Sequence, residues 1–357
     1  MDGRKWLRRI GVSVVGVLVF GLTLWATAAL YFDLPFTPLR KPVAVGYMAG
    51  LSSALFFYRD RRGFLITVIG FVVVLVWWLS LTPSHTRNWQ ADVAEIPWAE
   101  VDGDRVTIHN VRNCDYRAEF EYTCHWETRT FNLSKLNGLD IALTYWGSPW
   151  IAHPIVSFDF GDQGHVAMSI ETRDLIGQGY SPIRGFFHQY ALTYIASDER
   201  DVIRLRTNYR KNEEVYLFRT TAAPPIVRSL FLEYLQRANS LHQRPEWYNA
   251  LTNNCTTNIA VSVAQARDVR TRLDWRILLN GKMDEMMYER GGLVTEGLPL
   301  PALKEQAHIN AAARAADDSR DFSILIRKGR VGFTERPSLA MSVPSMAKIS
   351  GAAIPPE

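Results

Sequence analysis

The sequence predicts an α+β protein in which N-terminal transmembrane helices precede an extracytoplasmic domain with an antiparallel sheet. Three observations support this class. Residues 10–82 are strongly apolar, and nearly all acidic residues lie beyond them. Several segments between 98 and 220 alternate apolar and polar residues, which is the pattern of half-buried strands. After Pro225 the apolar residues recur at helical spacing instead.

The membrane region is predicted to cover residues 1–82 and to contain three transmembrane helices. The apolar stretches are residues 10–32, 43–58 and 64–81. The first and third are long enough to cross a hydrocarbon core of roughly 30 Å as helices, whereas the middle one is shorter. A cleaved signal peptide would explain the first stretch but not the two that follow. A buried helical hairpin is the alternative.

Basic residues predict the orientation of these helices. "MDGRKWLRR" precedes the first stretch, and "RDRRG" lies between the second and third. The positive-inside rule places both in the cytoplasm, although Arg40 and Lys41 in the other connection oppose this topology. Three spans then place everything after Leu81 outside. We therefore expect a multi-pass protein of a bacterial inner membrane with a periplasmic domain.

The outer part is predicted to comprise a linker at 83–97, a domain at 98–337 and a disordered tail at 338–357. "RVTIHNVRN", "DIALTYW" and "PIVSFDF" are expected to be strands. The turn "GDQG" predicts a β-hairpin over residues 155–172. "DVIRLRTNY" and "EVYLFRT" are expected to be further strands, and "IVRSLFLEYLQRANSLHQRP" a helix that ends near Pro245.

The chain has three cysteines, and an extracytoplasmic location permits disulfides. Cys114 and Cys124 are close enough to join a hairpin or short loop, so a disulfide is the preferred interpretation. A metal site with His109 and His125 is an alternative that lacks a zinc-type spacing, and two free thiols are another. No metal and no cofactor are expected. The mild net charge of +4 argues against a dedicated nucleic-acid binder.

Cys255 is then a lone thiol, and it precedes an apolar run in "WYNALTNNCTTNIAVSVAQ". Thr252 or Asn253 could cap a helix that starts here, which places Cys255 in the first turn. Free N–H groups and the helix dipole favour an anion there, so the thiol pKa should be lowered. This position suits a nucleophile. A small residue that only packs is the alternative.

A nucleophilic cysteine usually needs a histidine base, and we single out His165 among eight histidines. His165 starts the second strand of the predicted hairpin. It shares a strand face with Ala167 and Ser169, opposite Val166, Met168 and Ile170, and the small side chains should leave room for a helix end. His153, which precedes a proline, and His188, which follows two phenylalanines, could be structural.

Three motifs resemble the family of Lnb-type N-terminal periplasmic domains: "YWGSPWIAHPIVSFDFGDQGHVAMSIETR", "DERDVIRLRTNYRKNEEVYLFR" and "WYNALTNNCTTNI". The resemblance covers most of residues 98–300. That family is related to permuted papain-like proteins such as the lecithin:retinol acyltransferase group, in which a strand histidine precedes a cysteine at a helix start. The resemblance implies a permuted papain-like fold with a buried cysteine helix, and acyl transfer like lipoprotein N-acylation.

The remaining site residues are assigned as follows. The Cys255 N–H, with the Asn253 or Asn254 amide, would stabilise an oxyanion, although either asparagine could serve only as a cap. Ser169 and Glu171 lie too far along the strand to orient the His165 ring. The candidates for this role are therefore His188, Gln189, Tyr194 and Asp201, and the sequence does not rank them. Possible contacts with lipid headgroups come from Arg204, Arg206 and Arg210, which could equally form a solvated strand edge. Trp146 and Trp150 could line an acyl groove or anchor a loop.

Three functions follow. The first is a membrane-anchored periplasmic thiol acyltransferase with Cys255 as nucleophile and His165 as base, acting on a membrane lipid or lipoprotein. The second is a papain-like amidase or peptidase that cleaves cell-wall peptide or lipoprotein. The third is a non-catalytic envelope assembly factor, which we expect if Cys255 and His165 lie far apart.

Overall fold

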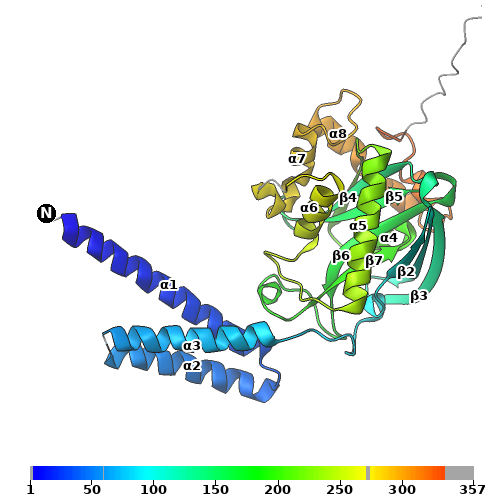
Figure 1. Cartoon of the computed structure of the whole chain (residues 1–357). Helices are drawn as coiled ribbons and strands as arrows, with labels where there is room; N and C mark the ends of the chain where they lie inside the picture. The colour runs from blue at the N-terminus through cyan, green and yellow to red at the C-terminus, as the bar shows by residue number, and fades with distance from the viewer. Residues whose placement is uncertain (1–2, 59, 271–273, 334–357) are drawn as a thin grey trace, which may run out of the picture.

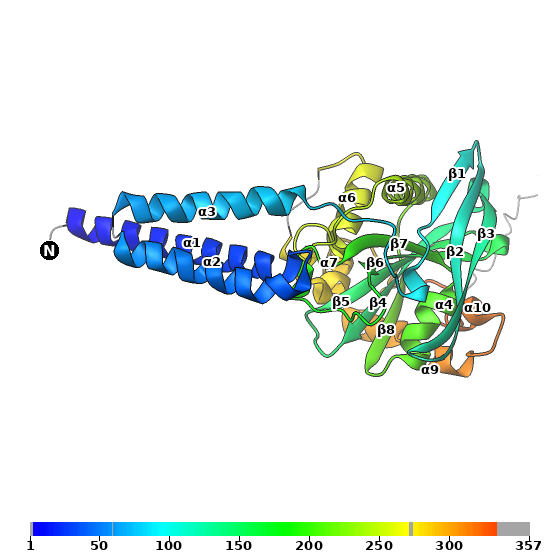
Figure 2. The same cartoon turned by 90° about the horizontal axis from the view of Figure 1, so that it is seen from below.

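Three N-terminal helices extend from one side of the folded body that the rest of the protein forms (Figures 1 and 2). They are α1 (Gly3–Asp33), α2 (Thr37–Phe57) and α3 (Arg61–Ser80). The computed structural model describes residues 3–58, 60–270 and 274–333. Among them, two helical segments are long and apolar enough to cross a membrane, Ser13–Asp33 and Arg61–Ser80. The third predicted span, in α2, does not reach that standard; α2 includes Arg40, Lys41 and Pro42, which shorten its apolar run.

The apolar side chains of α1 and α3 face outward. Val17 is 71% exposed and Val73 is 63% exposed. A helical hairpin buried in a soluble protein would cover such residues, so these helices need an apolar surrounding that the rest of the chain does not supply. The two candidate spans therefore fit a protein that is anchored in a membrane.

The remainder of the chain is built on an eight-stranded sheet in a mixed α+β body. The strand order is β1-β2-β7-β6-β5-β4-β8, and β3 pairs with the other edge of β2. All pairings are antiparallel except that between β2 and β7. The strands are β1 (Trp98–Asp102), β2 (Arg105–Ala118), β3 (Glu121–Asn132), β4 (Gly138–Trp146), β5 (Ala152–Asp159), β6 (His165–Arg173), β7 (Ala191–Ser197) and β8 (Glu213–Arg219).

Different helices cover the two faces of this sheet, because side chains alternate along each strand. Val166, Met168 and Ile170 of β6 join the core that packs against α5 (Pro224–Gln243) and α6 (Cys255–Ala266). Ala167 belongs to the core on the opposite face. That face is covered by α4 (Glu199–Arg204), the π-helix η5 (Leu205–Tyr209), α9 (Asn310–Ala315) and α10 (Phe322–Leu325).

A third cluster closes the β4–β8 end of the sheet. Ile141 and Leu143 of β4 pack there with Phe218 of β8. The covering elements are α7 (Met283–Glu289) and α8 (Leu300–Ala307), which follow α6 in the chain. This cluster places the segment around Asn280 against the start of β5, which becomes important for the site below.

The predicted hairpin at 155–172 is confirmed. Asp159 pairs with His165 and Ile155 with Ser169 in an antiparallel ladder. Gly161 and Gly164 both have positive φ angles, +60° and +85°, which a side chain would strain. The glycines of "GDQG" therefore permit the tight connection between β5 and β6.

The predicted strand "DVIRLRTNY" is wrong, because this segment forms α4 and η5. Asp198 caps α4 by accepting a hydrogen bond from the Arg200 N–H. Val202, Ile203 and Leu205 are all buried. Two adjacent apolar residues and a third two positions later suit one face of a helix, whereas a strand would send Val202 and Ile203 to opposite faces.

The predicted disulfide is confirmed between Cys114 and Cys124, which lie directly opposite each other on β2 and β3. Cys114 is almost fully buried beside Tyr116 and Leu205. A covalent link at this place ties the outer hairpin to the core of the domain and suits the oxidising conditions of the periplasm.

Replacing both Cys114 and Cys124 by serine should lower the free energy of unfolding by about 2–3 kcal/mol, because the unfolded chain regains the freedom that a loop of this length had lost. Chemical unfolding of the full chain in detergent measures this. Treating the native protein with a reductant should give the same loss, and the variant should then show no further response. An unchanged stability would mean that the disulfide contributes little.

The predicted linker at 83–97 packs against the body over part of its length. Trp89 and Val93 are buried with Ala191 and Ile195 of β7. The Arg173 side chain donates a hydrogen bond to the Val93 carbonyl, 2.8 Å away. These contacts hold the N-terminal helices in a defined place relative to the sheet.

Candidate active site

Cys255 is the first residue of α6, and the sequence around it explains why the helix begins there. Asn254 is the N-cap: its side-chain oxygen accepts a hydrogen bond from the Thr257 N–H at 3.0 Å. The Thr257 hydroxyl in turn accepts one from the Asn254 N–H at 2.9 Å, which completes a capping box. The Cys255 N–H has no backbone acceptor among the described residues and lies beside its own sulfur, so it is placed to stabilise a negative oxygen that forms there.

The Cys255 thiol is protonated rather than ionised at neutral pH. Burial raises its pKa and outweighs the hydrogen bonds from Thr256 and from the backbone, which lower it; the negative charge of Glu171 makes the smallest contribution, in the same direction as burial. Among the described residues its one side-chain polar contact is with the Thr256 hydroxyl, 3.7 Å away. The expected lowering of the pKa by the helix start is therefore wrong, because desolvation outweighs the helix N–H groups.

The two predicted asparagines are held by structural hydrogen bonds. The Asn254 amide donates to the Ala250 carbonyl. The Asn253 amide donates to the Trp247 carbonyl, and its oxygen accepts from Asn258. Both amide groups are thus engaged in forming the turn before α6. Of the candidates for the cap, Asn254 is the one that caps the helix, whereas Thr252 and Asn253 lie one or two residues before it. The free Cys255 N–H remains the candidate oxyanion donor.

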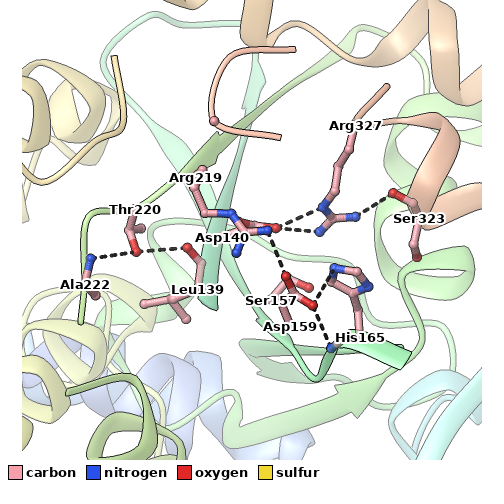
Figure 3. Close-up of polar contacts among 12 residues, drawn as sticks. Leu139, Asp140, Ser157, Asp159, His165, Arg219, Thr220, Ala222, Ser323 and Arg327 are labelled. Atoms are coloured by element: carbon pink, nitrogen blue, oxygen red, sulfur yellow. Dashed lines mark hydrogen bonds and ion pairs between the residues drawn. The ribbon is translucent and has the colours of Figure 1, made fainter. Parts of the chain in front are cut away.

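The structure does not bring His165 to Cys255. Cys255 packs against the core on the α5–α6 face, whereas His165 shares the opposite face with Ala167. His165 Nε2 lies 3.7 Å from an Asp159 oxygen, and Figure 3 shows the ring turned toward Asp159. The expectation that these residues form a pair is therefore wrong: the sheet separates them, and Arg327 and Glu199 fill the side on which we expected a helix end. This separation is the condition under which the sequence favoured a non-catalytic assembly factor, so a catalytic function now requires a base other than His165.

A different histidine lies near the start of α6, because a buried amide joins that helix to β5. The Asn280 amide donates a hydrogen bond to the Thr256 hydroxyl at 2.7 Å. Its oxygen accepts one from the Ala152 N–H at 2.9 Å. Asn280 thus ties the residue after Cys255 to the residue before His153, and it holds the two chain segments together.

His153 belongs to a polar cluster with Ser169 and Glu171 of β6. His153 Nε2 lies 2.7 Å from the Ser169 hydroxyl, and this hydroxyl donates to Glu171 Oε1 at 2.7 Å. Glu171 Oε1 is also 3.6 Å from His153 Nε2, and it accepts a hydrogen bond from Arg206 at 3.0 Å. The cluster therefore holds one nitrogen of the His153 ring, Nε2, and the contacts found among the described residues leave Nδ1 unengaged.

The charge states in this cluster suit a neutral base beside a carboxylate. Burial and then the Arg206 charge lower the pKa of His153, against the opposing effect of Glu171. Burial alone would raise the pKa of Glu171, but Arg206 and His153 hold it well below its usual value. At neutral pH Glu171 is thus ionised and His153 is neutral, the form that accepts a proton.

The β5–β6 ladder ends close to the residues that Asn280 ties to the start of α6. The pairing between these strands stops at Ile155 and Ser169, so His153 and Glu171 lie beyond the paired part. Pro154 lacks the N–H that would continue such a ladder. The link between this strand end and the start of α6 is Asn280, which bonds both Thr256 and the Ala152 N–H. The proline after His153 allows a structural interpretation of this histidine, but it also marks the place where the strands part.

The predicted lipid contacts are wrong for Arg204 and Arg206, which are 3% and 4% exposed. Arg204 pairs with Asp317 at 2.7 Å and Arg206 with Glu171. Arg210 is partly exposed and lies 3.5 Å from Glu213. These charges are paired within the domain because α4 and η5 pack against the sheet instead of forming an edge strand.

The other predicted partners have structural surroundings. Asp201 is fully buried and bonds the Arg112 guanidinium at 2.7 Å. Tyr194 lies in the core beside Tyr234. His188 and Gln189 contact the membrane helices. Trp146 and Trp150 are both exposed, and the Trp150 carbonyl accepts a hydrogen bond from the Gly281 N–H, next to Asn280. Within the described residues no group of three or more His, Cys, Asp or Glu could hold a metal ion.

The family comparison agrees with the resemblance seen in the sequence. Residues 122–281 match the family model described as the Lnb N-terminal periplasmic domain, a range that includes His153, Glu171 and Cys255. A comparison with curated proteins gives no match, and a comparison with solved structures gives none either. The family match and the two candidate spans fit a membrane-anchored protein that carries a periplasmic domain.

Proposed function

We propose that this chain is a membrane-anchored periplasmic acyltransferase that carries the acyl group as a thioester on Cys255. The observation that carries the proposal is the free thiol at the start of α6, tied through Asn280 to the strand end that holds the His153–Glu171 pair. We further propose that α1, α2 and α3 cross a bacterial inner membrane and that the domain adopts a permuted papain-like arrangement.

The proposed reaction has two halves. Cys255 Sγ attacks the carbonyl carbon of an ester in a lipid or lipoprotein while His153 takes the thiol proton, and the Cys255 N–H stabilises the negative oxygen. The alcohol then leaves with that proton. In the second half an amine attacks the thioester, an amide forms, the amine proton passes through His153, and the thiol is restored. Water in place of the amine would make the enzyme a hydrolase.

The roles of the supporting residues follow from their contacts. Glu171, through Ser169, holds the Nε2 side of His153 and leaves Nδ1 to receive the proton. Because the pKa of Cys255 is raised, the thiol does not ionise spontaneously, so catalysis requires transfer of its proton to the base during attack. In the structure without substrate, the thiol and the imidazole are not in contact. For the reaction to proceed, both groups must move toward the same carbonyl group of the substrate.

We expect a thioester on Cys255 when the full chain, in nanodiscs, meets a lipoprotein with ester-linked acyl chains and is quenched with acid. Mass spectrometry should find one acyl group on the peptide that contains Cys255, and neutral hydroxylamine should release it. Cys255→Ala should give no adduct. Thr252→Ala is the matched control, because Thr252 lies exposed in the same turn and should keep the adduct.

The fate of the adduct separates the three functions. Transfer of the label to an added lipoprotein amine supports the acyltransferase, and release as free fatty acid supports the hydrolase. If Cys255 stays unmodified with lipoprotein and phospholipid donors alike, the thiol is not a nucleophile for these esters. The assembly-factor function then accounts better for the domain.

A further inference from the structure

The connection between β6 and β7 lies at the domain end of the candidate membrane helices. The Phe187 ring stacks on Phe32 of α1 with centroids 4.8 Å apart. The His188 ring stacks on Trp78 of α3 at 3.7 Å. Figure 1 shows this green connection beside the ends of both helices. Phe32 and Trp78 lie at the ends of the segments Ser13–Asp33 and Arg61–Ser80, so a membrane crossed by these segments ends at this level.

Exposed apolar side chains surround this contact. Ile183 is 63% exposed and Phe186 is 38% exposed, one position before the packed Phe187. Leu251, in the turn before Cys255, is 53% exposed. We call these three residues the apolar tip. Arg184, also exposed, lies between the first two. Large apolar side chains beside a basic one are typical of segments that enter the interface of a membrane with anionic lipids.

The apolar tip is held rigidly by the two loops that carry it. The Ala250 N–H donates to the Gly185 carbonyl at 2.7 Å, which joins the turn with Leu251 to the segment with Ile183. The ring of His188 also stacks on Trp247 at 4.8 Å, and Trp247 donates to the Leu81 carbonyl just after α3. The tip therefore does not need to order itself on binding, and its position is fixed relative to the helix ends.

We propose that the apolar tip is inserted into the outer leaflet of the membrane that α1 and α3 cross. A lipid surface is the occupant that fits, because the tip continues directly from residues packed on the helix ends and carries a cation for lipid headgroups. Insertion would place the turn before Cys255 at the lipid surface. The inference depends on α1 and α3 spanning a membrane, and it does not depend on Cys255 being a nucleophile.

Spin labels on the full chain test this insertion. Ile183→Cys and Leu251→Cys are each made in a Cys255→Ala background, labelled, and placed in nanodiscs of phosphatidylethanolamine and phosphatidylglycerol. Ile324→Cys is the matched control, because Ile324 is also apolar and 65% exposed, but lies on α10 at the opposite side of the domain (Figure 2). Power saturation then measures the access of each label to oxygen, which enters lipid, and to a water-soluble nickel chelate.

At positions 183 and 251 the ratio of oxygen access to nickel access should be several-fold higher than at position 324. Equal ratios at all three positions would overturn the proposal, because the tip would then lie in water. Low access to both reagents at 183 and 251 would also overturn it, since protein would then cover the tip. Loss of acyl transfer in the Cys255→Ala background does not affect the readout, so failure here is distinguishable from failure of the proposed chemistry.

Discussion

Replacing His153 by alanine is expected to slow formation of the Cys255 thioester by about 10²- to 10⁴-fold, the range typical for loss of a general base. Replacing His165 by alanine should leave that rate within about twofold, since its imidazole faces Asp159 on the far side of the sheet and holds no place in the chemistry. Single-turnover acylation, corrected for the folded fraction, measures both rates. The two histidines begin or nearly begin adjacent strands of one hairpin, which makes His165→Ala a close control.

The pH dependence distinguishes a base from a structural residue. His153 must be neutral to accept the thiol proton, and its pKa is lowered by burial and by Arg206. The acylation rate should therefore hold as pH falls to 6.5 and decline only below the ordinary histidine value, as the ring gains a proton. In His153→Ala this acid limb should disappear from the residual rate. An unchanged acid limb in that variant, or a large loss in His165→Ala, would contradict the assignment.

The sequence predicted the helix start at Cys255 well, because the signals there are local. Asparagines and threonines that cap a helix directly precede an apolar run, and the observed cap, Asn254, is one of the candidates that the sequence offered. The β5–β6 hairpin was equally accessible, since its glycines need positive φ angles. Both features depend on a few neighbouring residues, so no tertiary contact was required to find them.

The partner of Cys255 was not accessible in the same way, because it depends on which face of the sheet α6 covers. The alternation of β6 correctly placed His165 opposite Val166 and Met168. An amphipathic helix packs on the more apolar face, so the same alternation already argued that α6 would lie away from His165. The small Ala167 side chain favoured the opposite prediction, a helix end beside His165. In the structure, α4 and the Arg327 side chain occupy that face of the sheet.

The buried arginines show a second limit of the sequence. Arg204 and Arg206 lie in a segment whose charges suggested a solvated edge, yet each finds an acidic partner far away in the chain. Asp317 is more than a hundred residues from Arg204. Local pattern carries no information about such partners, and without them a basic segment is correctly expected at the surface.

Replacing Arg327 by methionine is expected to lower the free energy of unfolding by about 3–5 kcal/mol, because it leaves buried carboxylates without their cation. Arg327 donates to Asp140 at 2.7 and 2.9 Å and to Glu199 at 2.6 and 2.7 Å. Figure 3 shows its guanidinium directed at Asp140. Asp140 also forms an ion pair with Arg219, with a nitrogen-to-oxygen distance of 2.8 Å. Asp140 and Glu199 are both fully buried. Asp140 thus keeps one arginine in the variant, whereas Glu199 keeps only the Ser157 hydroxyl among its described partners.

Arg117→Met is the matched control, since the Arg117–Glu121 pair is exposed and should contribute between 0 and about 1 kcal/mol. Adding Glu199→Gln to Arg327→Met should recover part of the loss, as a neutral amide costs less to bury than an unpaired carboxylate. Thermal and chemical unfolding of the full chain in detergent measure the stability of the unmodified protein and of these three variants. A loss in Arg327→Met no larger than that in Arg117→Met would show that the buried pairs only balance their desolvation.

The pH dependence of this loss has a definite sign. Burial alone would raise the pKa of Glu199, but the charge of Arg327 holds it below its usual 4.5. In the native protein the pair therefore contributes stability above pH 4.5, and this contribution falls as the carboxylate is protonated at lower pH. In Arg327→Met the carboxylate loses that cation, so its pKa should rise above 4.5 and the folded state should bind the proton more tightly than the unfolded chain. The stability deficit should thus be largest near neutral pH and shrink toward pH 5, where a protonated Glu199 can stay buried without a counter-charge.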